Sequence, residues 1–319
     1  MKRRPHIFRK TAMLLLGTLL FTSCTHDDLS DCPKQVRVHF TYVDREVNSA
    51  QVDRMHLYIF DQNGMFVSEY RDEEITRFNT DYYIDLPGLL PGNYRIIAWG
   101  GKDGRDYTTS PASFVKGKTT FEEAQLMLQH PDNTISSLVH HLFHADLAIT
   151  VNRSLVRQLF YMPLVQISNT INLSTLGLPA TTDNYTFNIT DDNCTYQFDR
   201  SFGYHAHAAS HLFTYSAPCT KDEAHQLHAT LHVLRLTADR RIPKLEVFNQ
   251  TTGKVLYPVG TQSGDLIELI LLAYKQNNFD TTHTYDIVLT FTGDESTGFK
   301  VDITINGWKV HDENTELID

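Results

Sequence analysis

The sequence predicts an all-β protein of two tandem β-sandwich domains that follow a signal peptide. Short segments in which apolar and polar residues alternate recur along the chain, and turn-forming residues separate them at regular intervals. Residues 24–319 are too many for one small sandwich and suit two domains of about 100 to 170 residues each. We therefore expect an N-terminal sandwich at residues 36–140 and a C-terminal sandwich at residues 141–319.

The first 23 residues have the layout of a signal peptide. Basic residues precede an apolar run at residues 12–21, and no acidic residue accompanies them; the basic residues are Lys2, Arg3, Arg4, Arg9 and Lys10. The apolar run is about half as long as a helix that crosses a bilayer. A cleaved signal peptide at residues 1–23 is therefore favoured over a transmembrane helix.

The apolar run ends in Phe21-Thr22-Ser23-Cys24, which resembles a bacterial lipobox. That resemblance implies acylation of the Cys24 sulfur and cleavage before Cys24, with residues 24–35 as a lipidated N-terminus and tether. Phe21 departs from the pattern, which prefers leucine at that position. The alternative is a plain secreted protein in which Cys24 is unmodified.

An acidic pair, Asp27-Asp28, closely follows the lipobox cysteine. Such a pair resembles the signal that sends Bacteroidetes lipoproteins to the outer face of the outer membrane, although an ordinary solvated linker has the same composition. Removal of residues 1–23 takes away five of the 28 Lys and Arg and none of the 38 Asp and Glu, which leaves a formal net charge of −15. A chain this acidic is not expected to bind nucleic acid.

Strand patterns begin directly after the tether. Residues 36–42 alternate apolar and polar side chains, as expected of a strand with one buried face. Residues 56–60 and 65–67 predict a hairpin, because Asn63-Gly64 between them tolerates the positive φ of a tight turn. Further strands are expected at residues 81–86 and 94–99, joined through two Pro-Gly pairs.

The middle of the chain predicts a short helix and a domain boundary. Residues 120–129 contain helix-favouring Glu, Ala and Gln together with two leucines, and residues 147–151 read as the first strand of a second domain that begins near residue 140. Six further strands complete the prediction, at residues 185–189, 227–236, 244–248, 266–273, 285–292 and 299–305.

Besides Cys24, the chain contains Cys32, Cys194 and Cys219. A disulfide between Cys194 and Cys219 is a hypothesis, since both fall in the same predicted domain, but sequence alone does not fix pairing. Cys32 is left without an assignment.

Histidines are numerous, and three groups of them raise the question of a metal site: His205, His207 and His211; His140, His141 and His144; and His225, His228 and His232. No carboxylate or cysteine completes a ligand set at an accepted spacing, so we expect neither a metal nor a cofactor. The sequence contains no Gly-x-Ser-x-Gly, His-Glu-x-x-His or phosphate-loop motif, and we expect no enzymatic activity.

Several motifs occur in a characteristic order behind the lipobox. They are Asp31-Cys32-Pro33, the hairpin that starts at Leu57-Tyr58-Ile59-Phe60-Asp61, the segment from Pro91 to Gly100, and His144-Ala145-Asp146-Leu147. In this order they resemble the FimB-type anchoring subunits of Bacteroidales fimbriae. The resemblance is strongest over the N-terminal third of the chain.

The resemblance implies two transthyretin-like β-sandwiches, lipid attachment to the outer membrane at the cell surface, and contact with fimbrial shaft subunits. It also implies an anchor that limits shaft length, with strand addition at a sheet edge as the mode of contact. Residues 299–305 are a donor-strand candidate, although a strand of the protein's own core is favoured. The alternatives are a surface glycan-binding lipoprotein, for which two Trp are few, and a fimbrial tip adhesin.

Overall fold

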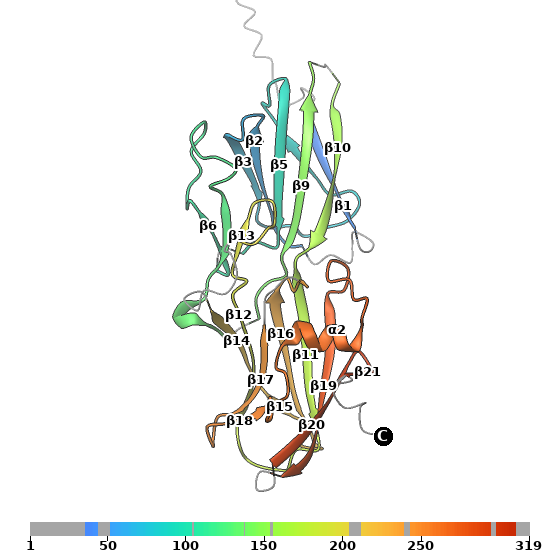
Figure 1. Cartoon of the computed structure of the whole chain (residues 1–319). Coiled ribbons are helices and arrows are strands. Elements are labelled where there is room, and N and C mark those ends of the chain that lie inside the picture. The colour runs from blue at the N-terminus through green and yellow to red at the C-terminus, as the bar shows by residue number, and fades with distance from the viewer. Residues whose placement is uncertain are drawn as a thin grey trace, which may run out of the picture.

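Two β-lobes stacked end to end give the molecule an elongated shape (Figure 1). The computed structural model describes residues 36–43, 52–103, 105–136, 138–153, 156–203, 212–238, 243–294 and 298–310. The predicted signal peptide, Cys24 and the predicted tether lie outside the described residues. No helix in the described part of the chain is long and apolar enough to cross a membrane.

The N-terminal lobe is a sandwich made from one seven-stranded sheet, β3-β2-β5-β9-β10-β1-β4. Its strands are β1 (Val36–Tyr42), β2 (Met55–Asp61), β3 (Phe66–Asp72), β4 (Tyr83–Leu86), β5 (Gly92–Gly100), β9 (Phe143–Val151) and β10 (Gln158–Gln166). β9 and β10 pair only at Phe143–Gln166 and His144–Val165. Beyond that point the sheet separates into two layers, β3-β2-β5-β9 and β10-β1-β4.

Buried and half-buried side chains alternate along β1, and the buried ones form part of the core between these layers. Val36, Val38 and Phe40 are buried, whereas Arg37 and His39 on the opposite face are only half-buried. The buried residues pack with apolar side chains of β2, β5, β9 and β10 into one cluster. The strand predicted at residues 36–42 is therefore present, with its expected face inward.

The predicted hairpin turn between β2 and β3 is also present. Oδ1 of Asp61 accepts hydrogen bonds from the backbone N–H groups of Asn63 and Met65, at 2.8 and 3.0 Å. Gly64 has φ +74°, a conformation that favours glycine. The turn therefore forms for the reason that the sequence suggested.

A small sheet covers the outer face of β2 and β5. It contains β6 (Tyr107–Ser110), β7 (Gln125–Leu128) and β13 (Thr195–Gln197). The helix predicted at residues 120–129 is wrong. Thr120 and Glu123 do exchange the two hydrogen bonds of a helix-capping box, but Leu126 and Leu128 then alternate with half-buried residues as in a strand.

The C-terminal lobe contains two further sheets, ordered β15-β16-β11-β19-β20-β21 and β18-β17-β12-β14-β8. Their strands are β8 (Thr134–Ile135), β11 (Ser168–Leu176), β12 (Tyr185–Asp191), β14 (Phe213–Pro218), β15 (Thr220–Lys221), β16 (Leu227–Leu234), β17 (Lys244–Asn249), β18 (Lys254–Tyr257), β19 (Thr284–Asp294), β20 (Gly298–Ile305) and β21 (Trp308–Lys309). Their inner faces share a large apolar core. The all-β prediction of two tandem sandwiches is confirmed.

One segment of this lobe is helical where a strand was expected. Residues 266–273 form α2 (Leu266–Ala273), which buries Leu266, Ile267, Leu269 and Ile270. Asp265 caps the helix, because its carboxylate accepts hydrogen bonds from the N–H groups of Ile267 and Glu268. A nearly continuous apolar run is compatible with either element, and the N-cap decides between them.

The structure does not divide at residue 140. β9 and β10 follow that position, yet β9 pairs with β5 and β10 pairs in parallel with β1, both in the N-terminal lobe. Ile167 is the single residue between β10 and β11, so the chain passes into the second lobe there. Conversely, β8 precedes residue 140 but pairs with β14 of the C-terminal lobe. Strands from both sides of residue 140 thus contribute to each lobe.

Candidate functional site

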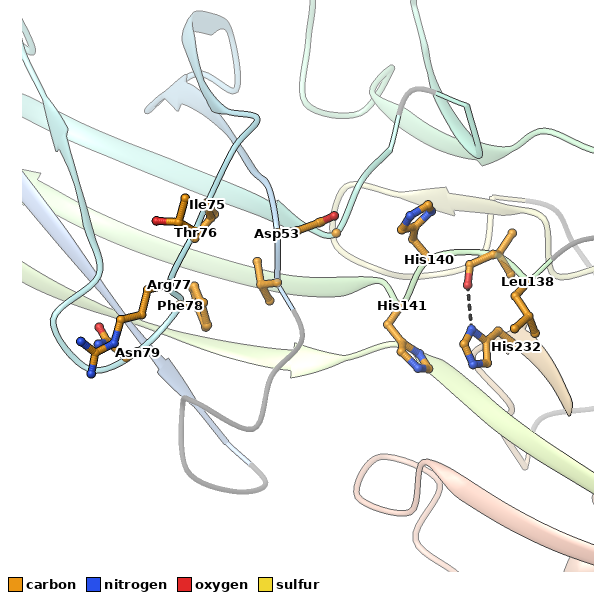
Figure 2. Close-up of a pocket in the computed structure, with 13 residues that line it drawn as sticks. Asp53, Ile75, Thr76, Arg77, Phe78, Asn79, Leu138, His140, His141 and His232 are labelled. Carbon is orange, nitrogen blue, oxygen red and sulfur yellow. Dashed lines mark hydrogen bonds between the residues drawn. The ribbon is translucent and has the colours of Figure 1, made fainter.

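A cleft of about 700 Å³ lies where the two lobes meet. In Figure 2, residues 75–79 lie on one side, His140, His141 and His232 lie on the other, and Asp53 lies between them. Residues of both lobes line the cleft, so its shape depends on how the lobes are docked. It is also the place where histidines from separate parts of the sequence meet.

The segment after β5 fixes one wall of this cleft. Gly101 has φ +72° and donates its backbone N–H to the carbonyl oxygen of Arg54 at 3.0 Å. A Cβ atom at Gly101 would overlap the carbonyl oxygen of His141, so the two backbones approach closely because residue 101 has no side chain. Farther along, one carboxylate oxygen of Asp106 binds both the backbone N–H and Nδ1 of His140, at 2.8 and 2.7 Å.

An ion network holds the same segment. The carboxylate of Asp103 lies 3.2 Å from Nη1 of Arg54 and 2.9 Å from Nη2 of Arg105. The hydrogen bond from Arg105 is the largest cause that holds the pKa of Asp103 well below its usual range, and the charge of Arg54 acts in the same direction. Asp103 is therefore ionised at neutral pH and keeps the strand end attached to the neighbouring loop.

Two imidazoles, those of His141 and His232, are paired in the cleft with ring centroids 4.2 Å apart. Nδ1 of His141 lies 3.1 Å from Oγ of Ser168, and Nδ1 of His232 lies 2.8 Å from the carbonyl oxygen of Val139. Burial, followed by the charges of His232 and other histidines, lowers the pKa of His141 to about 4. The His141 ring is therefore neutral at neutral pH.

The two histidine groups that lie within the described residues do not stay together. His144 is buried against Trp99 and its Nε2 lies 2.8 Å from the carbonyl oxygen of Phe198, while His228 pairs with Asp222 at 3.1 Å. His205, His207 and His211 lie outside the described residues. Within the described ranges, no group of three or more His, Cys, Asp or Glu side chains is placed to hold a metal ion. The His141–His232 pair was missed, because no local pattern signals contact between distant segments.

Acid is expected to destabilise the fold through His144. Burial lowers the pKa of His144 to about 4, whereas an unfolded histidine titrates near 6.5. Between these values the unfolded state binds more protons, so the stability present above pH 6.5 falls as the pH decreases toward 4. The loss is on the order of 3 kcal/mol once the pH is below both values, and about 2 kcal/mol of it falls between pH 7 and 5. Urea unfolding at pH 7, 6 and 5 measures it.

The variant His144→Gln serves as the control for this titration. Glutamine keeps a donor for the carbonyl oxygen of Phe198 but has no titratable group in this range. Its free energy of unfolding should change less between pH 7 and 5 than that of the wild type. Equal slopes for both proteins would exclude His144 as a source of the acid sensitivity.

The two cysteines proposed as a disulfide are both free thiols, Cys194 buried and Cys219 half-buried. The register of β12 explains why they do not pair. Cys219 donates its N–H to Tyr185 at the start of β12, whereas Cys194 follows Asp191 at its other end. A seven-residue strand spans about 20 Å, far beyond the roughly 7 Å Cα separation that a disulfide allows.

The first described strand, β1, begins at the end of the molecule that is remote from the C-terminal lobe. β1 runs parallel to β10 with Val36 beside Gln158, and β10 runs from there to Ile167, where the second lobe begins. β1 therefore begins at the far end of the first lobe (Figure 1). Residues 24–35, fully extended, would reach at most about 40 Å beyond it.

The C-terminal lobe contains a strand edge that is only partly covered. β21 pairs with β20 only at Thr304 and Ile305, and two carbonyl groups of the same β20 edge accept other hydrogen bonds, Val301 from Gln262 and Ile303 from Val310. β20 is itself a core strand, because it pairs with β19 over its whole length. The interpretation of residues 299–305 as part of the protein's own core is therefore confirmed.

Comparison with known proteins points to one family. A family model described as fimbrillin-A associated anchor proteins Mfa1 and Mfa2 matches residues 29–314. No curated protein matches the sequence significantly.

Solved structures share the fold at low sequence identity. The fimbrial anchor protein Mfa2 from Porphyromonas gingivalis is 22% identical with a TM-score of 0.71, and the match covers 88% of this chain and 99% of that one. A candidate polysaccharide-binding protein from Bacteroides thetaiotaomicron is 21% identical with a TM-score of 0.69, over 88% and 99% of the two chains. A candidate adhesin from Bacteroides ovatus is 18% identical with a TM-score of 0.70, over 86% and 94%.

Proposed function

The chain belongs to the family of fimbrillin-A associated anchor proteins Mfa1 and Mfa2, and on that premise we propose that it joins a fimbrium to the outer membrane through acylated Cys24. In this proposal the protein faces the cell surface and its fimbrial partners are shaft subunits. It also limits the length of the shaft. Its role is mechanical, not enzymatic.

One observation carries the proposal: Val36 lies at the end of the N-terminal lobe that is remote from the second lobe. If Cys24 is held in a bilayer, a tether that enters there directs the C-terminal lobe away from the membrane. The acyl chains would resist extraction, because each buried methylene contributes roughly 0.8 kcal/mol. The C-terminal lobe is then the part that a shaft subunit can reach.

The backbone connection and hydrogen bonds between the lobes are arranged to resist a pulling force. β10 continues through Ile167 into β11, so the path from one lobe to the other stays in extended backbone. The N–H of Ile167 is bonded to the carbonyl oxygen of Leu142 at 2.8 Å, and β8 and β13 pair across the junction. A pull on the second lobe would thus be resisted by several ladders of hydrogen bonds together.

The partly covered edge of β20 is the contact we assign to a shaft subunit. An added strand there would form main-chain hydrogen bonds, with alternate side chains fixing its register. β20 presents Lys300 and Asp302 beside Lys309, with Lys300 the most exposed of the three. Charged side chains on an edge strand oppose non-specific pairing with other strands. A partner strand must therefore carry side chains of complementary charge.

Photo-crosslinking in living cells tests this contact. A photoreactive residue at Lys300 should capture fimbrial shaft protein from the cell envelope. The control position is Lys116, an exposed lysine of the N-terminal lobe. The proposal fails if position 300 captures no fimbrial protein, or if position 116 captures it as efficiently.

A further inference from the structure

An exposed apolar patch surrounds the point where the tether enters the N-terminal lobe. It consists of Tyr83, Leu90, Val156, Leu159 and Tyr161, and we call it the tether-end patch. Leu90 and Val156 are each 74% exposed, and Tyr161 is 63% exposed. These are the highest values among the large apolar side chains of the described residues.

Strand register shows that these residues form one surface. Leu159 lies beside Arg37 on neighbouring strands, and Tyr161 and Tyr83 lie on either side of His39. The imidazole of His39 is 5.6 Å from the Tyr83 ring and 5.8 Å from the Tyr161 ring, measured between centroids. All of these side chains project from the outer face of the β10-β1-β4 layer, away from the core.

Leu90 and Val156 extend this surface past the ends of the strands. Leu90 follows β4 by four residues, and Val156 precedes β10 by two. Val36, at the start of β1, pairs with Leu86 on one side and Gln158 on the other, so the tether enters between the two connections. The patch is thus centred on the entry of the chain that precedes the described residues.

One connection at this end differs in charge from the whole chain. The connection at residues 152–157 contains Arg153 and Arg157 and no acidic residue, although the chain without residues 1–23 has a formal net charge of −15. Arg37 forms a two-point ion pair with Asp85 at 2.8 and 2.9 Å, and its guanidinium lies 3.4 Å from the centre of the Tyr83 ring. Protruding aliphatic side chains, tyrosines and arginines are the combination found at membrane interfaces.

We propose that the tether-end patch rests on a phospholipid bilayer surface, with Leu90 and Val156 inserted below the headgroups, Tyr83 and Tyr161 at headgroup level, and Arg153 on lipid phosphates. The acyl chains would hold the N-terminal lobe at the membrane, and the patch would fix the orientation of that lobe. This inference therefore rests on the proposed function. The rings of Tyr83 and Tyr161 are tilted by 47° and 30° from that of His39, so the three rings do not form one flat face on which a sugar would stack. The protruding aliphatic side chains, the tyrosines and the arginines favour lipid as the occupant.

Vesicle binding by a chain without acyl groups tests the proposal directly. Residues 24–319 with Cys24→Ser are mixed with vesicles of phosphatidylglycerol and phosphatidylethanolamine, and the bound fraction is measured by flotation. We expect binding that weakens as salt is added. The double variant Leu90→Asp with Val156→Asp should lower vesicle affinity about tenfold or more.

Val255→Asp is the matched control, because Val255 is an exposed valine of the C-terminal lobe. It should leave vesicle binding unchanged. The proposal is overturned if the parent chain does not bind vesicles, if the double variant binds as well as the parent, or if Val255→Asp lowers binding equally. A change in the association state of the double variant, without vesicle binding by the parent, would identify a second copy as the occupant instead.

The vesicle-binding assay and the crosslinking experiment at Lys300 can fail independently of each other. The vesicle assay needs neither acylation nor fimbriae, so its failure leaves the contact at Lys300 untouched. Conversely, failure of crosslinking at Lys300 would leave vesicle binding at Leu90 and Val156 intact.

Discussion

Replacing Gly101 by alanine is expected to destabilise the folded protein by about 3 kcal/mol or more. The new Cβ would overlap the carbonyl oxygen of His141, and a backbone atom cannot rotate away as a side chain can. Residue 101 also has a positive φ, which is unfavourable for alanine. Both effects act at the wall of the interlobe cleft, so the docking of the two lobes should weaken. Urea unfolding monitored by circular dichroism measures the loss.

Gly253→Ala separates the two causes. Gly253 has φ +71°, almost the same as Gly101, but a Cβ there would meet no atom within 4 Å. Its variant should therefore lose only about 1 kcal/mol, from backbone strain. If both alanine variants lost the same stability, the close approach of Gly101 to His141 would not be the cause.

Trp99→Ala is expected to cost about 3 to 5 kcal/mol, because it empties a large site in the core. Trp99 is fully buried and contacts the rings of His144 and Phe198, with centroids 4.7 and 5.7 Å away. Phe198 follows β13, so this contact joins the N-terminal sheet to a segment that comes from the C-terminal part of the chain. Loss of the indole should therefore loosen the junction as well as the core.

The other tryptophan provides the control. Trp308 is 62% exposed on β21, and Trp308→Ala should change stability by less than about 1 kcal/mol. Because the chain has two Trp, the fluorescence of Trp308→Ala reports on Trp99 alone. An unfolding midpoint for Trp99→Ala close to that of Trp308→Ala would contradict the central position of Trp99 in the core.

Local patterns in the sequence predicted the strands and turns whose causes are local. The alternation at residues 36–42 and the Asn63-Gly64 turn are examples, since a burial pattern and a backbone preference of a few residues determine them. The segment at residues 266–273 has no alternation, and its helical state depends on the cap formed by Asp265. The helix expected at residues 120–129 does not form, because pairing of β7 with β6 and β13 overrides the helical preference of its Glu, Ala and Gln residues.

Features that depend on long-range pairing could not be predicted in this way. The expected boundary at residue 140 misplaces β9 and β10, because nothing in their own sequence specifies β5 and β1 as partners. The same holds for the contact of His141 with His232 and for the separation of Cys194 from Cys219. The tether-end patch was missed because strand β10 was not predicted, and its exposed face becomes visible only once β1 and β10 lie side by side.

The most direct test of the anchoring account is to compare Cys24→Ala with the wild type on fimbriated cells. Detergent partitioning and intact mass report whether the chain is acylated, and fimbriae are counted on the cells and in the medium. The account predicts that the variant loses its lipid and that fimbriae are shed into the medium. Loss of the lipid with normal, cell-attached fimbriae would contradict it.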